Sequence, residues 1–296
     1  MDVIMKHTKR RKVIGVIAAI IAVILAVQVW FRIPFSPLKS EFQKDVEQLA
    51  GQGTTTHEVF TKDEFSHLPT ALQKYVETCG YIGTPKMNCL VMEYHDVAFK
   101  QGKDGPDLTI DYVQYDFANE PARIAFIDSS LFGIPFEGYD YYMNGIGGMK
   151  GVIAKGITIF DTRGEEIDKA CLVTYLSESL FAPSIILDDR IVWEEISDHE
   201  VRGTITYKGQ HASGIFRFND DYEYISFTTE DRTVSNNDGT MEYIPWSAEC
   251  GEYEVADNGI KYPTRFRAVW HYPDSDLVYF DGKIASILYD VNEPVI

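Results

Sequence analysis

The feature that most constrains this chain is an uncharged apolar stretch of 18 residues near its N-terminus, residues 13–30. As a helix, the stretch would be about 27 Å long, close to the roughly 30 Å hydrocarbon core of a bilayer. Trp30 and Phe31 stand where aromatic residues mark a membrane interface, and Pro34 ends the helical pattern. A buried core helix is disfavoured because the stretch is apolar all round and directly follows a cluster of cations. The sequence therefore predicts a transmembrane helix over residues 13–31, with the lipid bilayer as its partner.

The charges before this stretch predict its orientation. Five cations lie within the first 12 residues: Lys6, Lys9, Arg10, Arg11 and Lys12. Cations beside a membrane helix stay on the cytoplasmic side, so residues 1–12 are expected to form a basic cytoplasmic tail. The alternative is a cleaved signal peptide, with an apolar region of about 7–15 residues and small residues at its cleavage site. Residues 26–30 offer no such site, so we expect a single-pass protein of the cell membrane with most of the chain outside the cytoplasm.

The chain beyond the basic tail is acidic and rich in aromatic residues. It has 44 acidic and 22 basic residues, a formal net charge of −22. A surface of this sign repels nucleic acid, so nucleic-acid binding is disfavoured. With 18 Tyr and 17 Phe, aromatic residues make up 13% of the whole chain, which favours strands in the region after the anchor.

Hydrophobic periodicity divides the remainder into a stalk and one domain. Residues 32–60 are expected to form a stalk that contains a short helix over 40–49. Residues 61–296 are expected to form an extracytoplasmic domain with helices over 63–67, 69–79 and 168–180. Period-two alternation predicts strands over residues 87–99, 108–117, 122–129, 149–160, 190–196, 200–207, 210–218, 222–232, 250–256, 261–271 and 277–290.

Short connections between these strands indicate antiparallel neighbours. The fold class predicted is therefore α+β, with a large curled antiparallel sheet resembling half of a barrel, a few helices and one preceding transmembrane helix. A helix packed in the concave face is a natural way to cover such a sheet. The same concave face can hold an apolar ligand.

Metal and disulfide signals are weak. The four cysteines form no C-x-x-C pair: Cys79, Cys89, Cys171 and Cys250. Two alternatives stay open, a loop closed by Cys79 and Cys89 or four buried thiols. Glu93 and His95 share a strand face, but two ligands make no metal site. The oxygen-rich residues 236–239 fit a hairpin turn better than a calcium loop. We expect neither a metal nor a cofactor.

Several residues carry a resemblance to a family of uncharacterised bacterial membrane-tethered proteins that share a domain of unknown function. They are Leu68, Pro69, Leu72, Tyr75, Gly80 and Pro85, the segment 175–178 with Pro183, and Trp193, Arg232, Pro245, Trp246, Ile260, Pro263 and Trp270. The resemblance spans most of residues 65–290 and implies membrane tethering without a known activity. The order of elements also resembles that of periplasmic lipoprotein carriers and mycobacterial lipid-binding lipoproteins, which fold as a curled sheet around an apolar cavity.

The candidate site is centred on the helix over residues 168–180. Tyr175 and Glu178 lie three residues apart and so share one face of this helix. A glutamate in the concavity would need a cationic partner, for which Arg232 and Arg265 are the candidates. Trp193, Trp246 and Trp270 fall in or beside strands and would either pack in the core or line a cavity. The candidate ligand-binding residues are thus Tyr175, Glu178, Trp193, Arg232, Trp246 and Trp270.

The function favoured by this pattern is binding of a hydrophobic ligand such as a lipid or an acyl chain. No G-x-S-x-G motif is present and catalytic residues stay unknown, so an enzyme is the less favoured class. One alternative is an extracytoplasmic hydrolase whose site is assembled from distant residues, with Glu178 as acid or base. A second is a structural or interaction domain of an envelope complex, which would expose a large apolar patch.

Overall fold

The computed structural model describes residues 2–53, 58–235, 240–291 and 294–296. Its helices are α1 (Asp2–Arg32), α2 (Pro37–Ala50), α3 (Lys62–Phe65), α4 (Thr70–Thr78), α5 (Glu165–Glu178), the 3-10 turn η1 (Ser179–Phe181) and α6 (Pro183–Ile186). Its strands are β1 (Cys89–Lys100), β2 (Asp107–Phe117), β3 (Ala122–Leu131), β4 (Ile134–Met143), β5 (Ile146–Ile153), β6 (Ile157–Arg163), β7 (Ile191–Ser197), β8 (Glu200–Tyr207), β9 (Gln210–Phe218), β10 (Tyr224–Thr229), β11 (Thr233–Ser235), β12 (Met241–Tyr243), β13 (Trp246–Val255), β14 (Lys261–His271) and β15 (Asp276–Tyr289).

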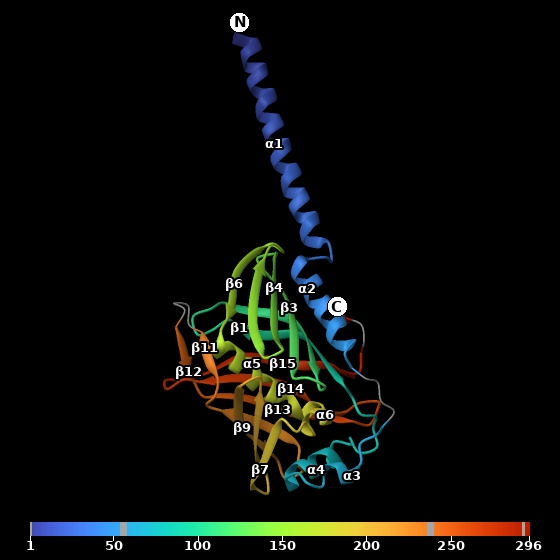
Figure 1. Ribbon diagram of the computed structural model, residues 1–296. Coiled ribbons are helices and arrows are strands. Elements are labelled where there is room, and N and C mark those ends of the chain that lie inside the picture. The colour runs from blue at the N-terminus through green and yellow to red at the C-terminus, as the bar shows by residue number, and fades with distance from the viewer. Residues whose placement is uncertain (1, 54–57, 236–239, 292–293) are drawn as a thin grey trace.

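One antiparallel sheet of 13 strands forms the domain, in the order β6-β5-β4-β3-β2-β1-β15-β14-β13-β10-β9-β8-β7. The strands β1 to β6 follow one another as a meander, and the pairing of β1 with β15 joins this half to the strands of the second half. β6 and β7 are the two edges, and the chain passes between them through α5, η1 and α6. The helix α5 therefore lies across the concave face of a curled sheet (Figure 1). This confirms the predicted α+β half-barrel.

Several hairpins turn on two residues with positive φ. Asn144 and Gly145 have φ values of 55° and 83°, and Lys208 and Gly209 have values of 50° and 85°. A two-residue turn with both φ values positive matches the right-handed twist of the flanking strands, and glycine adopts this conformation without a steric cost. These short turns place each strand beside its predecessor, which is why the topology is a meander.

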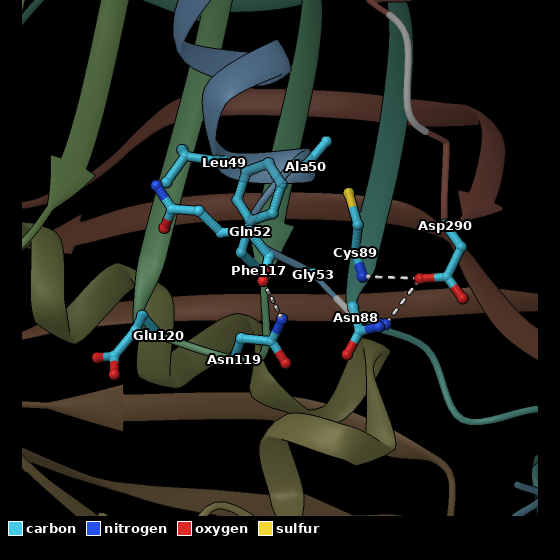
Figure 2. A pocket seen from close by; sticks show the side chains of 10 residues that line it. All are labelled: Leu49, Ala50, Gln52, Gly53, Asn88, Cys89, Phe117, Asn119, Glu120 and Asp290. Carbon is cyan, nitrogen blue, oxygen red and sulfur yellow. Dashed lines mark hydrogen bonds between the residues drawn. The ribbon is translucent and has the colours of Figure 1, made fainter. Parts of the chain in front are cut away.

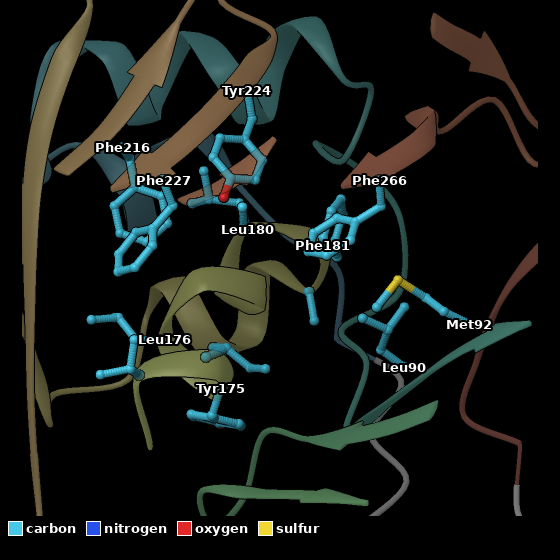
Figure 3. Packing of buried hydrophobic residues seen from close by; sticks show 14 of the residues in the cluster. Leu90, Met92, Tyr175, Leu176, Leu180, Phe181, Phe216, Tyr224, Phe227 and Phe266 are labelled. Carbon is cyan, nitrogen blue, oxygen red and sulfur yellow. The ribbon is translucent and has the colours of Figure 1, made fainter. Parts of the chain in front are cut away.

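The main core fills the concave face. Leu172, Val173, Leu176 and Leu180 from the α5 segment are fully buried against rings of the sheet. Figure 3 shows the α5 segment surrounded by side chains from β1, β9, β10 and β14. Gly147 of β5 allows close contact, because a Cβ atom there would lie 2.8 Å from the Cβ atom of Cys171. The glycine-rich start of β5 thus serves tight packing between sheet and helix.

A second core lies on the convex face, beneath α2. Ser36 caps this helix by accepting a hydrogen bond from the Lys39 backbone NH at 3.0 Å. Leu38, Phe42 and Val46 are spaced by four residues, and all three are buried against the sheet. The segment predicted as a stalk therefore contains a helix packed on the domain. The division of the chain at residues 12, 31 and 60 stays a prediction.

The helix α1 extends away from the domain (Figure 1). Within the part of the chain that the structure describes, it is the one helix long and apolar enough to cross a membrane, and its apolar window has no burial against the domain.

Three consecutive strands, β4 to β6, differ from the prediction. The strand expected over residues 149–160 is a hairpin of β5 and β6, and β4 was not expected. The turn at residues 154–156 has its positive φ values, 55° and 62°, on Ala154 and Lys155 and not on Gly156, so the residues that bend are not ones that usually do so. The oxygen-rich turn expected at residues 236–239 lies outside the described residues.

Candidate functional site

A cavity of about 110 Å³ lies in the concave face between α5 and the sheet. Its apolar wall is made mainly of aromatic rings from the strands: Tyr94, Phe99, Tyr112, Trp246, Phe266, Tyr279 and Phe280. Its polar wall consists of Gln114, Arg123, Asp140, Thr174, Glu178 and Arg232. The site is therefore amphipathic, with rings on one side and charges on the other.

Arg123 of β3 organises the polar wall. Its Nε donates to Glu178 Oε2 at 2.7 Å, and its Nη1 donates to Asp140 Oδ2 at 2.7 Å. Its Nη2 donates to the Tyr112 hydroxyl at 2.5 Å and to Gln114 Oε1 at 3.0 Å. Arg123 and Glu178 are only 5% and 3% exposed, so this is a buried ion pair. Because each of the three guanidinium nitrogens has an acceptor, Arg123 is fully occupied by the protein itself.

The strand β2 brings a second carboxylate to this cluster. Tyr112, Gln114 and Asp116 alternate along β2 and so point to one face of the sheet. Gln114 Nε2 donates to Asp116 Oδ2 at 2.9 Å and to Glu178 Oε2 at 2.8 Å, while Asp116 Oδ1 is buried without a partner. In the second half of β2, Gln114 and Asp116 alternate with Val113, Tyr115 and Phe117, and this alternation was the sequence signal that could have indicated the cluster.

Burial shifts the proton affinities of the cluster. It raises the pKa of Asp116 well above its ordinary value, and the nearby negative charge of Glu178 adds to the rise. Burial also raises the pKa of Glu178, an effect that the ion pair with Arg123 opposes. The protonated form of Asp116 is thereby favoured, which lowers the negative charge held in the interior.

Arg232 contrasts with Arg123. Its guanidinium carbon stands 4.3 Å from the ring centre of Trp246 and 5.3 Å from that of Trp270. Its Nε and Nη1 atoms are buried and have no hydrogen-bond partner. The predicted pairing of Glu178 with Arg232 or Arg265 is therefore wrong. Arg123 takes that role because it lies on a strand that faces α5, whereas Arg265 is bound at the surface by Asp281 at 2.9 Å.

The structure brings three of the six candidate residues together. Glu178, Arg232 and Trp246 line the cavity. Trp270 contacts it through Arg232 and stacks on Tyr279, with 5.9 Å between the ring centres.

The other two candidates belong to the packed interior. Tyr175 is fully buried and donates its hydroxyl hydrogen bond to the Phe117 carbonyl at 2.9 Å. Trp193 donates to the Ile186 carbonyl at 2.9 Å and packs on Phe216. Neither lines the cavity.

A second cavity of about 220 Å³ lies beside the end of α2 (Figure 2). There the Asp290 carboxylate accepts hydrogen bonds from the backbone NH groups of Asn88 and Cys89, at 2.7 and 3.1 Å. Burial raises the pKa of the Cys89 thiol above its ordinary value. A carboxylate that is bound to backbone NH groups and a protonated thiol are structural features rather than a reactive pair.

The cysteines and histidines form no further site among the described residues. All four cysteines are free thiols, so the alternative of a loop closed by Cys79 and Cys89 is wrong. Burial raises the pKa of Cys79 and Cys171 to about 12. No group of three or more metal-ligating side chains occurs in the described ranges.

The fold and the cavity define a class of protein: a curled antiparallel sheet that encloses α5 and a small amphipathic site. The chain belongs to a family of unknown function (DUF6544), whose model matches residues 58–282. This confirms the predicted resemblance to a family without a known activity. Comparison with curated proteins gave no match.

Two solved structures are similar to this chain over most of its length. One is described as an outer membrane lipoprotein-sorting protein domain from Vibrio parahaemolyticus, with 9% identity and a TM-score of 0.40 over 74% of this chain and 91% of that chain. The other is a DUF1329 family protein from Desulfovibrio piger, with 12% identity and a TM-score of 0.37 over 84% of this chain and 93% of that chain.

Proposed function

We propose that the domain binds an amphipathic ligand, with its apolar part against the aromatic wall and an anionic group at Arg232. One observation carries this proposal: a guanidinium with two buried, unpaired NH-bearing atoms lines a cavity made mainly of rings. Buried donors without an acceptor cost free energy, so a site that contains them is complete only with an acceptor.

The charges of the polar wall favour an anion over a cation at this position. Arg123 is neutralised by Glu178 and Asp140. Arg232 is the cation of this wall for which the described residues supply no carboxylate partner. Stacking on Trp246 holds the guanidinium plane in place, so a carboxylate or phosphate would meet hydrogen-bond donors that are already oriented. Carboxylates and phosphates both accept hydrogen bonds from a guanidinium, so the proposal covers both kinds of anion.

The size of the cavity limits how much of the ligand it holds. At about 110 Å³ it is smaller than the roughly 300–1,000 Å³ of pockets that enclose drug-sized ligands. The proposal is therefore that the cavity takes a short apolar group or the end of a longer chain. A whole acyl chain would require rings such as Phe266 and Phe280 to move.

The first test uses the full chain purified from host membranes in a mild detergent, with bound amphiphiles extracted and quantified by mass spectrometry. Arg232→Gln is compared with Arg265→Gln, an arginine at the exposed surface. Both variants keep α1, so lipid held by the helix cancels in the comparison. An anionic amphiphile is expected in the wild type and in Arg265→Gln and is expected to be lost from Arg232→Gln; equal amounts in all three would contradict the proposal.

A second test measures selectivity directly by tryptophan fluorescence, since Trp246 and Trp270 both contact Arg232. Octanoate and octanol have the same chain length and differ in charge. A charge-assisted hydrogen bond contributes about 1.5–3 kcal/mol, so octanoate is expected to bind roughly ten- to a hundredfold more tightly than octanol. Arg232→Gln should abolish this preference. If the preference for octanoate persists in the variant, a group other than Arg232 binds the anion.

A hydrolase is the second candidate, favoured by the location of Glu178 in the cavity and by the rise of its pKa through burial. Against it, Glu178 Oε2 already accepts hydrogen bonds from Arg123 and Gln114. Screening the full chain with ester, amide and glycoside substrates tests it. Activity that Glu178→Gln removes, while the fold stays intact, would favour the enzyme over the binding module.

We further propose that α1 is an uncleaved anchor with the N-terminal tail in the cytoplasm and the domain outside. The cluster of cations before an apolar helix of this length supports it. The test is whether the purified mature chain keeps its N-terminus and stays in membranes after washing at alkaline pH. A chain that begins near residue 30 would be a cleaved product instead.

A further inference from the structure

The domain carries exposed apolar side chains at the end that meets α1. Phe132 in the turn between β3 and β4 is 96% exposed, more than any other large apolar residue in the described part of the chain. Ile157 and Ile159 of the edge strand β6 are 61% and 51% exposed. Isolated apolar residues at a surface are ordinary, but these three belong to neighbouring hairpins at one end of the sheet.

Hydrogen bonds hold the two hairpin turns against the end of α1. Trp30 Nε1 donates to the Ala154 carbonyl at 3.2 Å, and Lys155 Nζ donates to the carbonyls of Ile33 and Phe35. The Ala154 NH donates to the Pro135 carbonyl at 2.8 Å, which joins the β5–β6 turn to the start of β4. Figure 1 shows these strand ends beside the point where α1 enters the domain.

The turn at Phe132 lies level with the last turn of α1. Gln28 and Phe31 of α1 and Gly133 and Pro135 of the hairpin line one open cavity of about 600 Å³. If α1 spans a bilayer, its last turn with Trp30 lies in the interface between hydrocarbon and water. The hairpin beside the last turn of α1 then lies at the same depth in the membrane.

Local conformation does not explain the aromatic residue in this turn. Phe132 and Gly133 have φ values of 53° and 78°, a two-residue turn that favours Asn, Asp or Gly at both positions. A bulky side chain with positive φ is strained, and Phe132 gains no packing within the protein. The equivalent positions of two other hairpins hold Asn144 and Lys208, which are polar. An aromatic ring that enters a bilayer interface supplies the missing stabilisation.

We infer that the tips of the β3–β4 and β5–β6 hairpins, with Phe132 and Ile157, enter the lipid interface beside α1. This inference rests on the proposed anchor. The cavity between them is lined by Arg32 and Lys39, by the carboxylates of Asp128 and Glu137, and by Lys155, which is buried and bound to backbone carbonyls. Arg32 and Lys39 are the cations of this cavity that can meet lipid phosphates. The domain is then held against the bilayer by a second contact besides the anchor, with the bilayer as the occupant of the patch.

The test uses the full chain reconstituted in phosphatidylcholine–phosphatidylglycerol liposomes. Phe132→Cys, Ile157→Cys and Val192→Cys each receive an environment-sensitive fluorophore. Val192 is apolar and 60% exposed, and it belongs to β7, a strand that lies away from α1 (Figure 1). The native thiols have pKa values raised by burial, so the introduced cysteines are labelled selectively at pH 7.5, and labelled wild type gives the background.

Lipids with a nitroxide on the headgroup or the upper acyl chain then quench labels that lie in the interface. Quenching of the labels at positions 132 and 157 is expected to exceed that at position 192 by at least about threefold. Flotation of the same liposomes measures anchoring separately. A chain that floats but shows equal quenching at all three positions overturns the hairpin contact alone, and a chain that fails to float overturns the anchor as well. A blue shift at position 132 that depends on protein density, without quenching, assigns the patch to a second copy of the chain and also overturns the inference.

Discussion

The two faces of the sheet are both covered by a helix, yet they are filled in different ways. On the convex face, Phe42 of α2 packs edge-on against Tyr115 and Tyr139, with 5.9 Å between the ring centres in both pairs. On that face the Tyr139 hydroxyl donates to Asp45 at 2.6 Å, and one carboxylate of the sheet, Glu137, is buried beside the start of α2. On the concave face, Arg123, Glu178 and Asp116 are buried in the interior around α5.

The difference supports the proposal that the concave face does more than cover a sheet. Removing charges from water costs several kcal/mol per ion. A protein is often as stable when apolar residues of similar volume replace a buried ion pair. The convex face demonstrates that this chain can cover a sheet with ordinary apolar packing. The inner charges and the unpaired Arg232 are therefore better explained by recognition than by stability, and the following experiments test that contrast.

The largest effect is expected from Arg123→Met, because it leaves Glu178 and Asp140 buried without their counter-ion. The free energy of unfolding should fall by about 3–5 kcal/mol, measured by chemical denaturation of the full chain in detergent. The double variant Arg123→Met/Glu178→Met should recover part of this loss. A loss below about 1 kcal/mol for the single variant would show that water reaches the cluster.

On the convex face, Phe42→Ala should lower the free energy of unfolding by about 3 kcal/mol through lost burial and a residual cavity. Octanoate binding should stay unchanged in this variant, because no residue of α2 lines the inner cavity. Denaturation and fluorescence titration of one sample measure both quantities. If binding weakens in parallel with stability, the two faces are coupled and the contrast between them fails.

The pH dependence of stability should separate the faces. The folded state raises the pKa of Asp116, so it binds a proton more tightly than the unfolded chain does. The contribution of Asp116 to the free energy of unfolding is thus greatest below the carboxyl pKa of the unfolded chain, about 4. It is lost as the pH rises toward the pKa of Asp116 in the folded state. Asp116→Asn should stabilise the protein by about 1–3 kcal/mol at pH 8 and have little effect at pH 4. An equal effect at both pH values would show that Asp116 is ionised throughout.

The smallest effect is expected from Arg265→Gln. This arginine lies at the surface, where its ion pairs with Asp281 and Glu252 are screened by water and salt. Thermal unfolding of the full chain should show no resolved shift in the midpoint. A destabilisation comparable to that of Arg123→Met would mean that exposure does not distinguish the two arginines.

Most of the fold could be predicted because its signals are local. Alternating apolar residues indicated most of the strands, and glycine-containing turns such as Lys208-Gly209 indicated antiparallel neighbours. The hairpin of β5 and β6 was missed because the positive φ values fall on Ala154 and Lys155, which seldom adopt them, and not on the adjacent Gly156. The candidate site was predicted in part: Glu178, Arg232 and Trp246 line the cavity, and Trp270 reaches it only through Arg232.

The amino-acid sequence by itself determined the apolar N-terminal helix, the acidic domain and the curled antiparallel sheet, because charge and periodicity are properties of neighbouring residues. Only the tertiary structure decided that Glu178 pairs with Arg123, 55 residues away, and that Arg232 is left unpaired between two tryptophans. Such pairings depend on which strands become neighbours and which side chains point to the same interior. No local pattern specifies that choice, since it follows from the closure of the whole sheet around α5.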